Sequence, residues 1–426
     1  MPKFEETSRS MAILMLDSVI NDGKLLSELT ASKNFLSLAP PDRARAQRLA
    51  LETLRGLERA DRVLAKFLQK KPPSKVHNIL RLAAVEICCG SQAHGVVNEA
   101  VNLVGRDKKF THFKGMVNAV LRKVAQKGPD HWASLRVSRI PVWLRGPLSD
   151  AYGKDVVGEI EKIQFETPPV DLTLKYPNQA TRVAKDLGGQ VLLGQSVRLD
   201  NAGQISKLAG FEAGDWWVQD AAASIPVRLL NDLKGKTALD LCAAPGGKTL
   251  QLSAAGAKVT AVDISERRLK LLEENLNRTG LKADVQAVDA FELDTQRYDV
   301  IVLDAPCSAT GTMRRHPDLP YAKDGTEFGA LIDLQQSLLN HALTLLAPEG
   351  RLVYCTCSLL PDEGEVQVET ALEQNADFEV DPEMFNFASL PCDWFIENLG
   401  LRLRPDYLAS EGGMDGFFVS VLRRKA

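Results

Sequence analysis

A glycine-rich segment at Asp240–Thr249, of sequence DLCAAPGGKT, follows a short apolar run and precedes a helical pattern. Its small residues let the backbone approach a ligand closely, and the helix that follows offers its N-terminal amides. Asp263 stands 23 residues after Asp240, where a carboxylate that bonds ribose hydroxyls belongs, and Asp289 and Asp304 close two further apolar runs. The combination predicts a nucleotide-like ligand at the carboxyl ends of parallel strands.

Two other interpretations of the glycine-rich segment compete with this one. Gly247–Thr249 matches the end of a phosphate-binding loop, and Tyr298–Asp304 matches the strand and acid that help hold magnesium in nucleoside triphosphatases. That loop requires a glycine at position 242, but this chain has Cys242 there. A phosphate-binding loop would also leave Asp263 and Asp289, the acids after the second and third apolar runs, without a function. A glycine-rich turn with no ligand is disfavoured by the same acids.

Cysteine is the second residue type whose placement suggests chemistry. The count of seven is odd and Cys307, Cys355 and Cys357 lie near glycine or proline, so a disulfide framework is improbable. Cys307 and Cys357 each follow an expected strand at its carboxyl end, which makes them candidate catalytic thiols. Cys355 and Cys357 alone do not make a zinc site, because no second closely spaced cysteine pair exists and the six histidines are scattered. We expect no metal, and we expect Cys355 to point into the core.

The elements that position these residues alternate between strand and helix after residue 215. A helix is predicted at Glu266–Arg278, whose leucines share one face. Such alternation predicts right-handed βαβ crossovers and a mostly parallel, doubly wound sheet. The expected strands are Thr237–Leu241, Lys258–Val262, Asp284–Val288, Tyr298–Leu303 and Arg351–Cys355.

The chain divides into three predicted parts. Residues 1–130 show apolar positions at three- and four-residue spacing and form an all-α domain that ends at Gly128-Pro129. Residues 131–215 are rich in proline and contain a strand-like alternation at Asp171–Tyr176, which predicts a small α+β connecting unit. Residues 216–426 form the α/β domain.

Composition and charge fit a globular protein with an unequal charge distribution. The 426 residues are 45% hydrophobic and 25% charged. Residues 1–130 carry a net charge of +9 and residues 131–426 carry −12, which suggests a basic module that meets a polyanion. A solvated helical surface is the alternative reading. Glu5 and Glu6 stand where a signal peptide would be basic, and no apolar run approaches the roughly 20 residues of a membrane span, so we expect a cytoplasmic location.

The blocks DLCAAPGGKT at 240–249, DAPCS at 304–308, RRHPD at 314–318 and TCS at 356–358 resemble the Nol1/Nop2/Sun family of RNA cytosine-5 methyltransferases. Upstream, residues 80–87, 97–101 and 117–123 look like a NusB-like helical domain. That domain precedes the catalytic region in the bacterial branch of the family that acts on 16S ribosomal RNA. The resemblance implies a multidomain protein with an all-α NusB-like domain, a small α+β connector and a Rossmann-like class I methyltransferase domain.

The resemblance also implies a cofactor and roles for individual residues. S-adenosylmethionine would lie on the loop 242–248, with its ribose at Asp263, its adenine at Asp289 and Asp304 between cofactor and base. Gly364, where asparagine is usual, and Leu172–Lys175 depart from the family pattern. The implied cofactor contacts are Cys242, Ala243, Ala244, Pro245, Gly246, Gly247, Lys248, Asp263, Arg268, Asp289 and Asp304.

By the same resemblance, Cys357 is the nucleophile, Cys307 assists release of the product and Asp304 is the third catalytic group. Arg314, Arg315 and His316 form a basic loop expected to contact phosphate, with a plain solvated loop as the alternative. The expected partner is RNA, most simply 16S ribosomal RNA, with no membrane involved. A non-catalytic RNA-binding factor remains the alternative function, and the cysteine pair separates the two because binding does not require it.

Overall fold

The computed structural model describes residues 7–293, 296–387 and 390–425. The chain forms two compact units. The first contains Met1–Glu166 and Met313–Gly325, and the second contains Thr167–Thr312 and Thr326–Ala426. Within the described ranges, no helix is both long and apolar enough to cross a bilayer.

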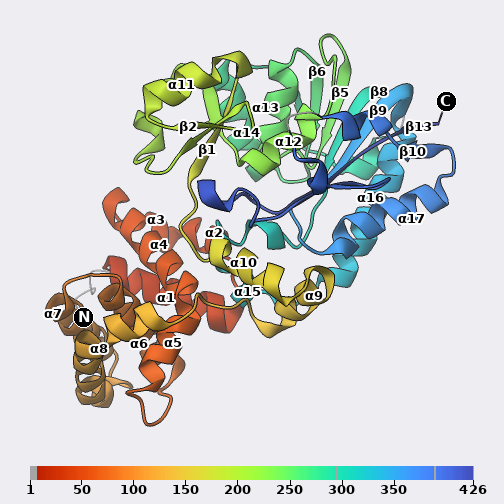
Figure 1. Ribbon diagram of the computed structural model, residues 1–426. Helices are drawn as coiled ribbons and strands as arrows, with labels where there is room; N and C mark the ends of the chain where they lie inside the picture. The colour runs from red at the N-terminus through yellow and green to blue at the C-terminus, as the bar shows by residue number, and fades with distance from the viewer. Residues whose placement is uncertain (1–6, 294–295, 388–389, 426) are drawn as a thin grey trace. The chain divides into compact units, whose positions relative to one another are not determined.

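The first unit is built from helices, of which α1–α10 run from red to gold in Figure 1, as the amphipathic spacing predicts. Thr7 caps the first helix by accepting a hydrogen bond from the Ser10 amide, and Gly23 ends it in the left-handed conformation, with φ +67°. Apolar side chains from α1 and α4–α8 share one core. The helices are α1 Ser8–Asp22, α2 Leu26–Thr30, α3 Lys33–Leu36, α4 Pro40–Arg55, α5 Leu57–Ala65, α6 Ser74–Cys88, α7 Ala93–Arg106, α8 Lys114–Ser134, α9 Val142–Tyr152, α10 Lys154–Gln164 and α15 Leu319–Ala322.

Helix α8 runs through the point where we expected the helical domain to end. Gly128 and Pro129 lie inside it rather than in a turn. The glycine serves close packing, since a Cβ at Gly128 would lie 3.2 Å from the Cys88 Sγ atom and 2.8 Å from Val124 Cγ1. The expected break at Gly128-Pro129 is therefore wrong, and the compact unit continues to Glu166.

A short segment from the second half of the sequence completes the first unit. In Met313–Gly325 the Asp318 carboxylate accepts a hydrogen bond from the Leu26 amide at 2.8 Å. Trp143 Nε1 donates to the Pro320 carbonyl at 3.1 Å, and Tyr321 packs against the helical core. The segment Met313–Gly325 therefore belongs to the helical unit although it lies within the second half of the sequence.

The second unit holds a nine-stranded sheet with the order β11-β12-β13-β9-β8-β5-β6-β7, and β10 pairs with β13 (Figure 1). All five expected strands are present, and they form the parallel part of the sheet. The strands on the far side of β9 run antiparallel, so the sheet is mixed rather than mostly parallel. The strands are β5 Thr237–Leu241, β6 Lys258–Val262, β7 Asp284–Gln286, β8 Tyr298–Asp304, β9 Leu346–Thr356, β10 Phe378–Val380, β11 Phe395–Ile396, β12 Gly400–Leu403 and β13 Phe417–Arg424.

Helices cover both faces of this sheet, which is the doubly wound arrangement that the sequence predicts. Alternate strand residues separate into two cores, with Ala238 and Val302 in one and Leu239 and Leu303 in the other. The first core includes side chains of α12, and the second includes side chains of α16 and α17. The helices of the unit are α11 Ala180–Leu187, α12 Ala221–Arg228, α13 Gly247–Ala254, α14 Glu266–Thr279, α16 Phe328–Thr344 and α17 Glu365–Gln374.

A second, antiparallel sheet precedes the large one, with the order β2-β3-β1-β4. Its strands are β1 Val170–Leu174, β2 Gln190–Leu192, β3 Ser196–Leu199 and β4 Trp216–Val218. The buried pair Arg198–Asp171 joins β3 to β1 at 2.7 Å, with both side chains fully inaccessible. Arg198 also donates to the carbonyls of Glu411 and Gly413, and Asp171 accepts from the Ala221 amide. This one ion pair thus fixes the small sheet to two segments of the large domain.

We expect Arg198→Met to lower the free energy of unfolding of the second unit by about 3–5 kcal/mol, because it leaves the Asp171 carboxylate buried without a cation. Denaturant unfolding followed by the fluorescence of Trp216 and Trp217 measures it. Arg182→Met is the matched control, since the Arg182–Asp186 pair is exposed and its loss should cost less than about 0.5 kcal/mol. Equal effects of the two variants would contradict the role given to the buried pair.

Candidate active site

The carboxyl ends of β5, β6, β8 and β9 bring the predicted site residues to one edge of the sheet. The loop after β5 begins at Cys242, in the left-handed conformation with φ +59°, and passes through Gly246 at φ +106°. A Cβ at Gly246 would lie 2.3 Å from Leu272 Cδ1, so this position requires glycine for both space and conformation. Helix α13 then starts at Gly247. The loop is consequently packed tightly onto α14.

Two side chains tie this loop to the next strand. The Asp263 carboxylate, after β6, accepts hydrogen bonds from the Ala244 amide at 3.1 Å and the Ser265 amide at 2.8 Å. Arg268 donates to the Ala244 carbonyl and lies 3.5 Å from Asp263. The Asp263 carboxylate can accept hydrogen bonds from ribose hydroxyls, and the amides at the N-terminus of α13 can donate to a carboxylate. Together they suit the ribose and the carboxylate of an adenosyl cofactor.

Asp289 is less closely tied to the loop. Its carboxylate accepts a hydrogen bond from the Phe291 amide at 3.0 Å, at the start of a short 3-10 turn after β7. Among the residues that the structure describes, no hydrogen bond joins it to the loop 242–248 or to Asp263. Its proximity to adenine stays a prediction.

Lys248 and Asp304 form an ion pair that the sequence did not predict. The Lys248 ammonium donates to Asp304 Oδ2 at 2.7 Å, and Lys248 is buried while Asp304 is a third exposed. Burial alone would lower the pKa of Lys248, but the negative charge of Asp304 outweighs it and the pKa is raised. The Lys248 side chain therefore stays cationic and holds the Asp304 carboxylate in place.

The two thiols meet at this edge. Cys307 Sγ lies 3.4 Å from Cys357 Sγ, and both side chains are half-buried. The hydrogen bond with Cys357, followed by burial, raises the pKa of Cys307 well above its usual value. The two cysteines are 50 residues apart in the sequence, so their contact could be suggested by the sequence but is seen only in the folded sheet.

The two other cysteines of this edge are not placed to act as nucleophiles. Cys355 is fully buried in the core, as predicted, and its Sγ also lies 3.6 Å from Asp304 Oδ1. Burial raises the pKa of Cys355 well above its usual value, and burial together with nearby acids raises that of Cys242 to about 12. No group of three or more histidine, cysteine or acidic side chains in the described part of the chain could hold a metal ion.

Glu363, to which no sequence pattern assigns a role, contacts the Cys307 loop. Its carboxylate is fully buried and accepts a hydrogen bond from the Ser308 amide at 2.8 Å. The signal available in the sequence was weak, since an acid six residues after Cys357 stands in a run of three acids, Asp362, Glu363 and Glu365.

The expected phosphate contact of the 314–316 loop is wrong for Arg314. Its side chain is fully buried, and its carbonyl accepts a hydrogen bond from Arg55 at 2.9 Å. The reason is that Met313–Gly325 belongs to the helical unit and packs there instead of lying in solvent.

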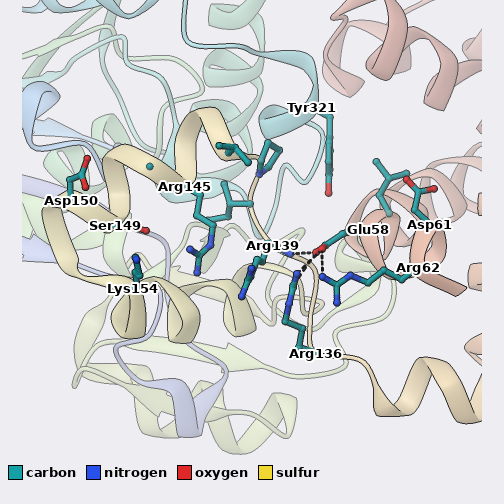
Figure 2. A pocket seen from close by; sticks show the side chains of 15 residues that line it. Glu58, Asp61, Arg62, Arg136, Arg139, Arg145, Ser149, Asp150, Lys154 and Tyr321 are labelled. Carbon is teal, nitrogen blue, oxygen red and sulfur yellow. Dashed lines mark hydrogen bonds and ion pairs between the residues drawn. The ribbon is translucent and has the colours of Figure 1, made fainter. Parts of the chain in front are cut away.

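A pocket of about 690 Å³ in the first unit is rich in basic side chains (Figure 2). Arg62 and Arg136 converge on the Glu58 carboxylate, and Arg145 pairs with Glu161 at 2.8 Å. The remaining cations of the lining, Arg139 and Lys154, are exposed, and their side chains make no ion pair within the described residues. These two are the cations of the pocket that are free to meet an anion.

Comparison with known proteins matches both parts of the chain. Residues 227–423 match the family described as 16S rRNA methyltransferase RsmB/F, and residues 6–126 match the NusB family. The chain is 31% identical to "Ribosomal RNA small subunit methyltransferase B" of Pasteurella multocida (strain Pm70), over 98% of this chain and 96% of the relative. The protein of that name from Cronobacter sakazakii (strain ATCC BAA-894) is also 31% identical, over 98% of each chain.

Solved structures show the same fold. The crystal structure of PH0851 has a TM-score of 0.73 at 19% identity and covers 99% of this chain and 100% of its own. NSun6 from Pyrococcus horikoshii has a TM-score of 0.56 at 20% identity, over 67% of this chain and 98% of that one. The predicted fold class, a NusB-like helical domain followed by a Rossmann-like methyltransferase domain, is confirmed.

We expect Asp240→Asn to flatten the dependence of stability on pH. Asp240 is fully buried at the end of β5 beside Thr249, and burial raises its pKa from 3.8 to about 7. Because the folded state holds this proton to higher pH than the unfolded state, the stabilisation is complete below about pH 4 and is lost as the pH rises to about 7. The melting temperature of the wild type should therefore fall more steeply than that of the variant over this range.

The matched control for Asp240→Asn is Asp299→Asn. A hydrogen bond from the Thr237 amide lowers the pKa of Asp299, so its carboxylate stabilises the fold above about pH 4. Asp299→Asn should lower the melting temperature at neutral pH and leave it nearly unchanged at low pH. Parallel profiles for the wild type and Asp240→Asn would contradict a protonated, buried Asp240.

Proposed function

The chain belongs to the 16S rRNA methyltransferase RsmB/F family, and we propose that it methylates carbon 5 of a cytosine in 16S ribosomal RNA through a covalent cysteine adduct. The methyl donor is S-adenosylmethionine, which supplies an electrophilic methyl group when bound. The observation that carries the proposal is the 3.4 Å pair of Cys307 and Cys357 at the sheet edge that also holds Asp304 and the loop 242–248.

Carbon 5 of cytosine is a poor nucleophile, so the enzyme must first change the ring. Addition of the Cys357 thiolate to carbon 6 forms a carbon–sulfur bond and moves the π electrons of the ring toward carbon 5. Carbon 5 then forms a bond to the methyl carbon, whose old bond to sulfur breaks with its electron pair left on sulfur. Asp304, ion-paired with Lys248, can accept a hydrogen bond from the exocyclic amine and orient the ring.

Release reverses the addition. The proton on carbon 5 leaves, its bonding electrons restore the double bond, and the bond between carbon 6 and Cys357 breaks to return a thiolate. Cys307 is the group at hand to take that proton. Once Cys357 is bonded to carbon, it no longer shares a hydrogen bond with Cys307, so the first cause of the raised Cys307 pKa disappears. Cys307 can then ionise at the step where a base is required.

Cells that lack this protein test the substrate. Bisulfite sequencing of their 16S ribosomal RNA should show one 5-methylcytosine missing, restored by the wild-type chain and not by Cys357→Ala. An unchanged pattern of 5-methylcytosine in 16S ribosomal RNA would refute the proposed substrate.

The two thiols should fail at different steps. Cys357→Ala leaves carbon 5 unactivated, so neither methylated product nor adduct should form. Cys307→Ala should still permit addition and methyl transfer but stall release, so a protein–RNA adduct should survive denaturing electrophoresis. Cys89→Ala is the control, because that thiol is exposed at the end of α6, is not part of this sheet edge, and its loss should leave turnover intact. A stable adduct with Cys357→Ala would reverse the two assignments, and normal turnover in both variants would remove thiol catalysis.

We assign the holding of RNA to the first unit, which carries 30 Lys and Arg against 20 Asp and Glu. The excess of basic residues thus belongs to a compact unit that ends at Glu166 and also includes the segment Met313–Gly325. Within this unit, Arg139 and Lys154 in the pocket of Figure 2 are the free cations that suit phosphate contact. A target base in RNA must also leave its stack before a thiol can reach it, so firm backbone contacts elsewhere stabilise the complex.

The double variant Arg139→Ala/Lys154→Ala should weaken binding to RNA and flatten its salt dependence. Each phosphate contact contributes roughly 0.7–0.9 to the slope of log affinity against log salt, so the slope should fall by about 1.4–1.8. Arg48→Ala/Lys162→Ala removes the same charge from exposed positions of α4 and α10 outside the pocket and should change the slope far less. Equal slopes for the two double variants would mean that only net charge matters.

A further inference from the structure

Glu363 is a fully buried carboxylate beside the cysteine pair. It lies at the end of a short 3-10 turn, Pro361–Glu363, six residues after Cys357. No ion pair involves it within the residues that the structure describes. A buried carboxylate without a cation is costly unless several donors surround it, so its retention at this position requires an explanation.

All of the carboxylate's hydrogen-bond partners lie on the Cys307 side of the site. Its Oε1 atom accepts from the Ser308 amide at 2.8 Å and from Gln335 Nε2 at 3.0 Å, and its Oε2 atom accepts from the Ser308 hydroxyl. Gln335, on α16, also donates to the Pro306 carbonyl at 2.8 Å. The residues before and after Cys307 are therefore both held by the same network.

The backbone of Glu363 is held on the Cys357 side. Its carbonyl accepts hydrogen bonds from the Tyr354 hydroxyl at 2.9 Å and the Thr356 hydroxyl at 3.1 Å, both on β9. One residue thus links the strand that ends before Cys357 to the loop that carries Cys307.

Two further contacts bring the cysteine segments together. The hydroxyl oxygens of Ser308 and Ser358, each directly after a cysteine, lie 3.3 Å apart, and the Gly311 amide donates to the Cys357 carbonyl at 2.9 Å. These bonds are weaker constraints on the Cys307 loop than a buried carboxylate with three charge-assisted bonds.

We propose that Glu363 is a positioning residue whose carboxylate clamps the Cys307 loop to the end of β9 and thereby sets the separate roles of the two thiols. This inference rests on the proposed thiol mechanism. It goes beyond that mechanism because it gives one residue control over which thiol adds to the base and which serves release.

The charge of Glu363 acts in the same direction as the clamp. After the hydrogen bond with Cys357, burial and the charge of Cys357, the negative charge of Glu363 also raises the pKa of Cys307. When Cys357 is bonded to carbon 6, the contribution of Glu363 remains. The charge of Glu363 thereby helps to keep Cys307 a neutral thiol while Cys357 adds to the base.

Glu363→Gln tests the charge, because glutamine keeps the side-chain length and one acceptor oxygen. In the protein without RNA, the rate of iodoacetamide alkylation of Cys307 should shift to lower pH by about one unit or more, as expected for loss of a nearby charge. Peptide mass spectrometry separates Cys307 from Cys357. This measurement does not depend on methyl transfer, so it distinguishes a failure of the inference from a failure of the proposed function.

With RNA and methyl donor, Glu363→Gln should still form the adduct but release it at least tenfold more slowly than the wild type. Asp362→Asn is the matched control, since it removes an exposed charge one residue away and should shift neither alkylation nor release. An unchanged Cys307 alkylation profile in Glu363→Gln would overturn the electrostatic role, and unchanged release would overturn the positioning role.

Ser308→Ala provides a second variant should Glu363→Gln fail to fold. It removes the hydroxyl bond to the carboxylate but keeps the charge and the amide bond. Release should slow while the pH profile of Cys307 alkylation stays that of the wild type. A shifted profile with normal release in Ser308→Ala would contradict the division between clamp and charge.

Discussion

The parallel pairing of β8 with β9 is the constraint on which the site depends. Its register places Asp304 opposite Cys355, and the Ala305 amide continues the ladder to the Cys355 carbonyl at 3.0 Å. Both strands end at the same edge of the sheet, so the segments that carry Cys307 and Cys357 lie next to each other. A shift of one residue in this register would turn one of the predicted site residues to the opposite face of the sheet. The separation of the thiols follows from the sheet, and Glu363 refines it.

The same edge of the sheet brings several carboxylates together, and burying all of them in the charged form would cost free energy. Asp240, Asp263 and Asp304 end three neighbouring strands, and Lys248 is the cation that pairs with the last of them. Two features lower this cost: Asp263 is hydrogen-bonded by backbone amides, and burial raises the pKa of Asp240 to about 7, so that its neutral form is favoured below that pH. A protonated Asp240 leaves the charge of Lys248 to Asp304, the carboxylate nearest the reacting base in the proposed mechanism.

The sequence predicted the parts of this architecture that depend on local pattern. Strands β5 and β6 have the predicted bounds, because short apolar runs with an acid at or just after their carboxyl end leave little freedom in where a buried strand ends. The antiparallel strands beyond β9 were not predicted, since most of them are short and β13 pairs with β9 and β10, which are distant in sequence. The Ser308–Glu363 bond and the Lys248–Asp304 pair join residues 55 and 56 positions apart, and only the folded sheet brings them together. The burial of Arg314 escaped prediction because a basic run gives no sign of the core into which it folds.

The path of the chain after Cys307 explains why a clamp on this loop is useful. Five residues beyond Cys307 the chain leaves the second unit, runs through Met313–Gly325 in the helical unit, and returns at Thr326 shortly before α16. The excursion is anchored within the helical unit by Asp318 and Leu26. A loop whose downstream end is fixed in a different compact unit needs its own attachment to the catalytic sheet if the thiol spacing is to stay constant. Gln335 on the returning helix and Glu363 after Cys357 supply that attachment, so the geometry of the thiols is set within the catalytic unit itself.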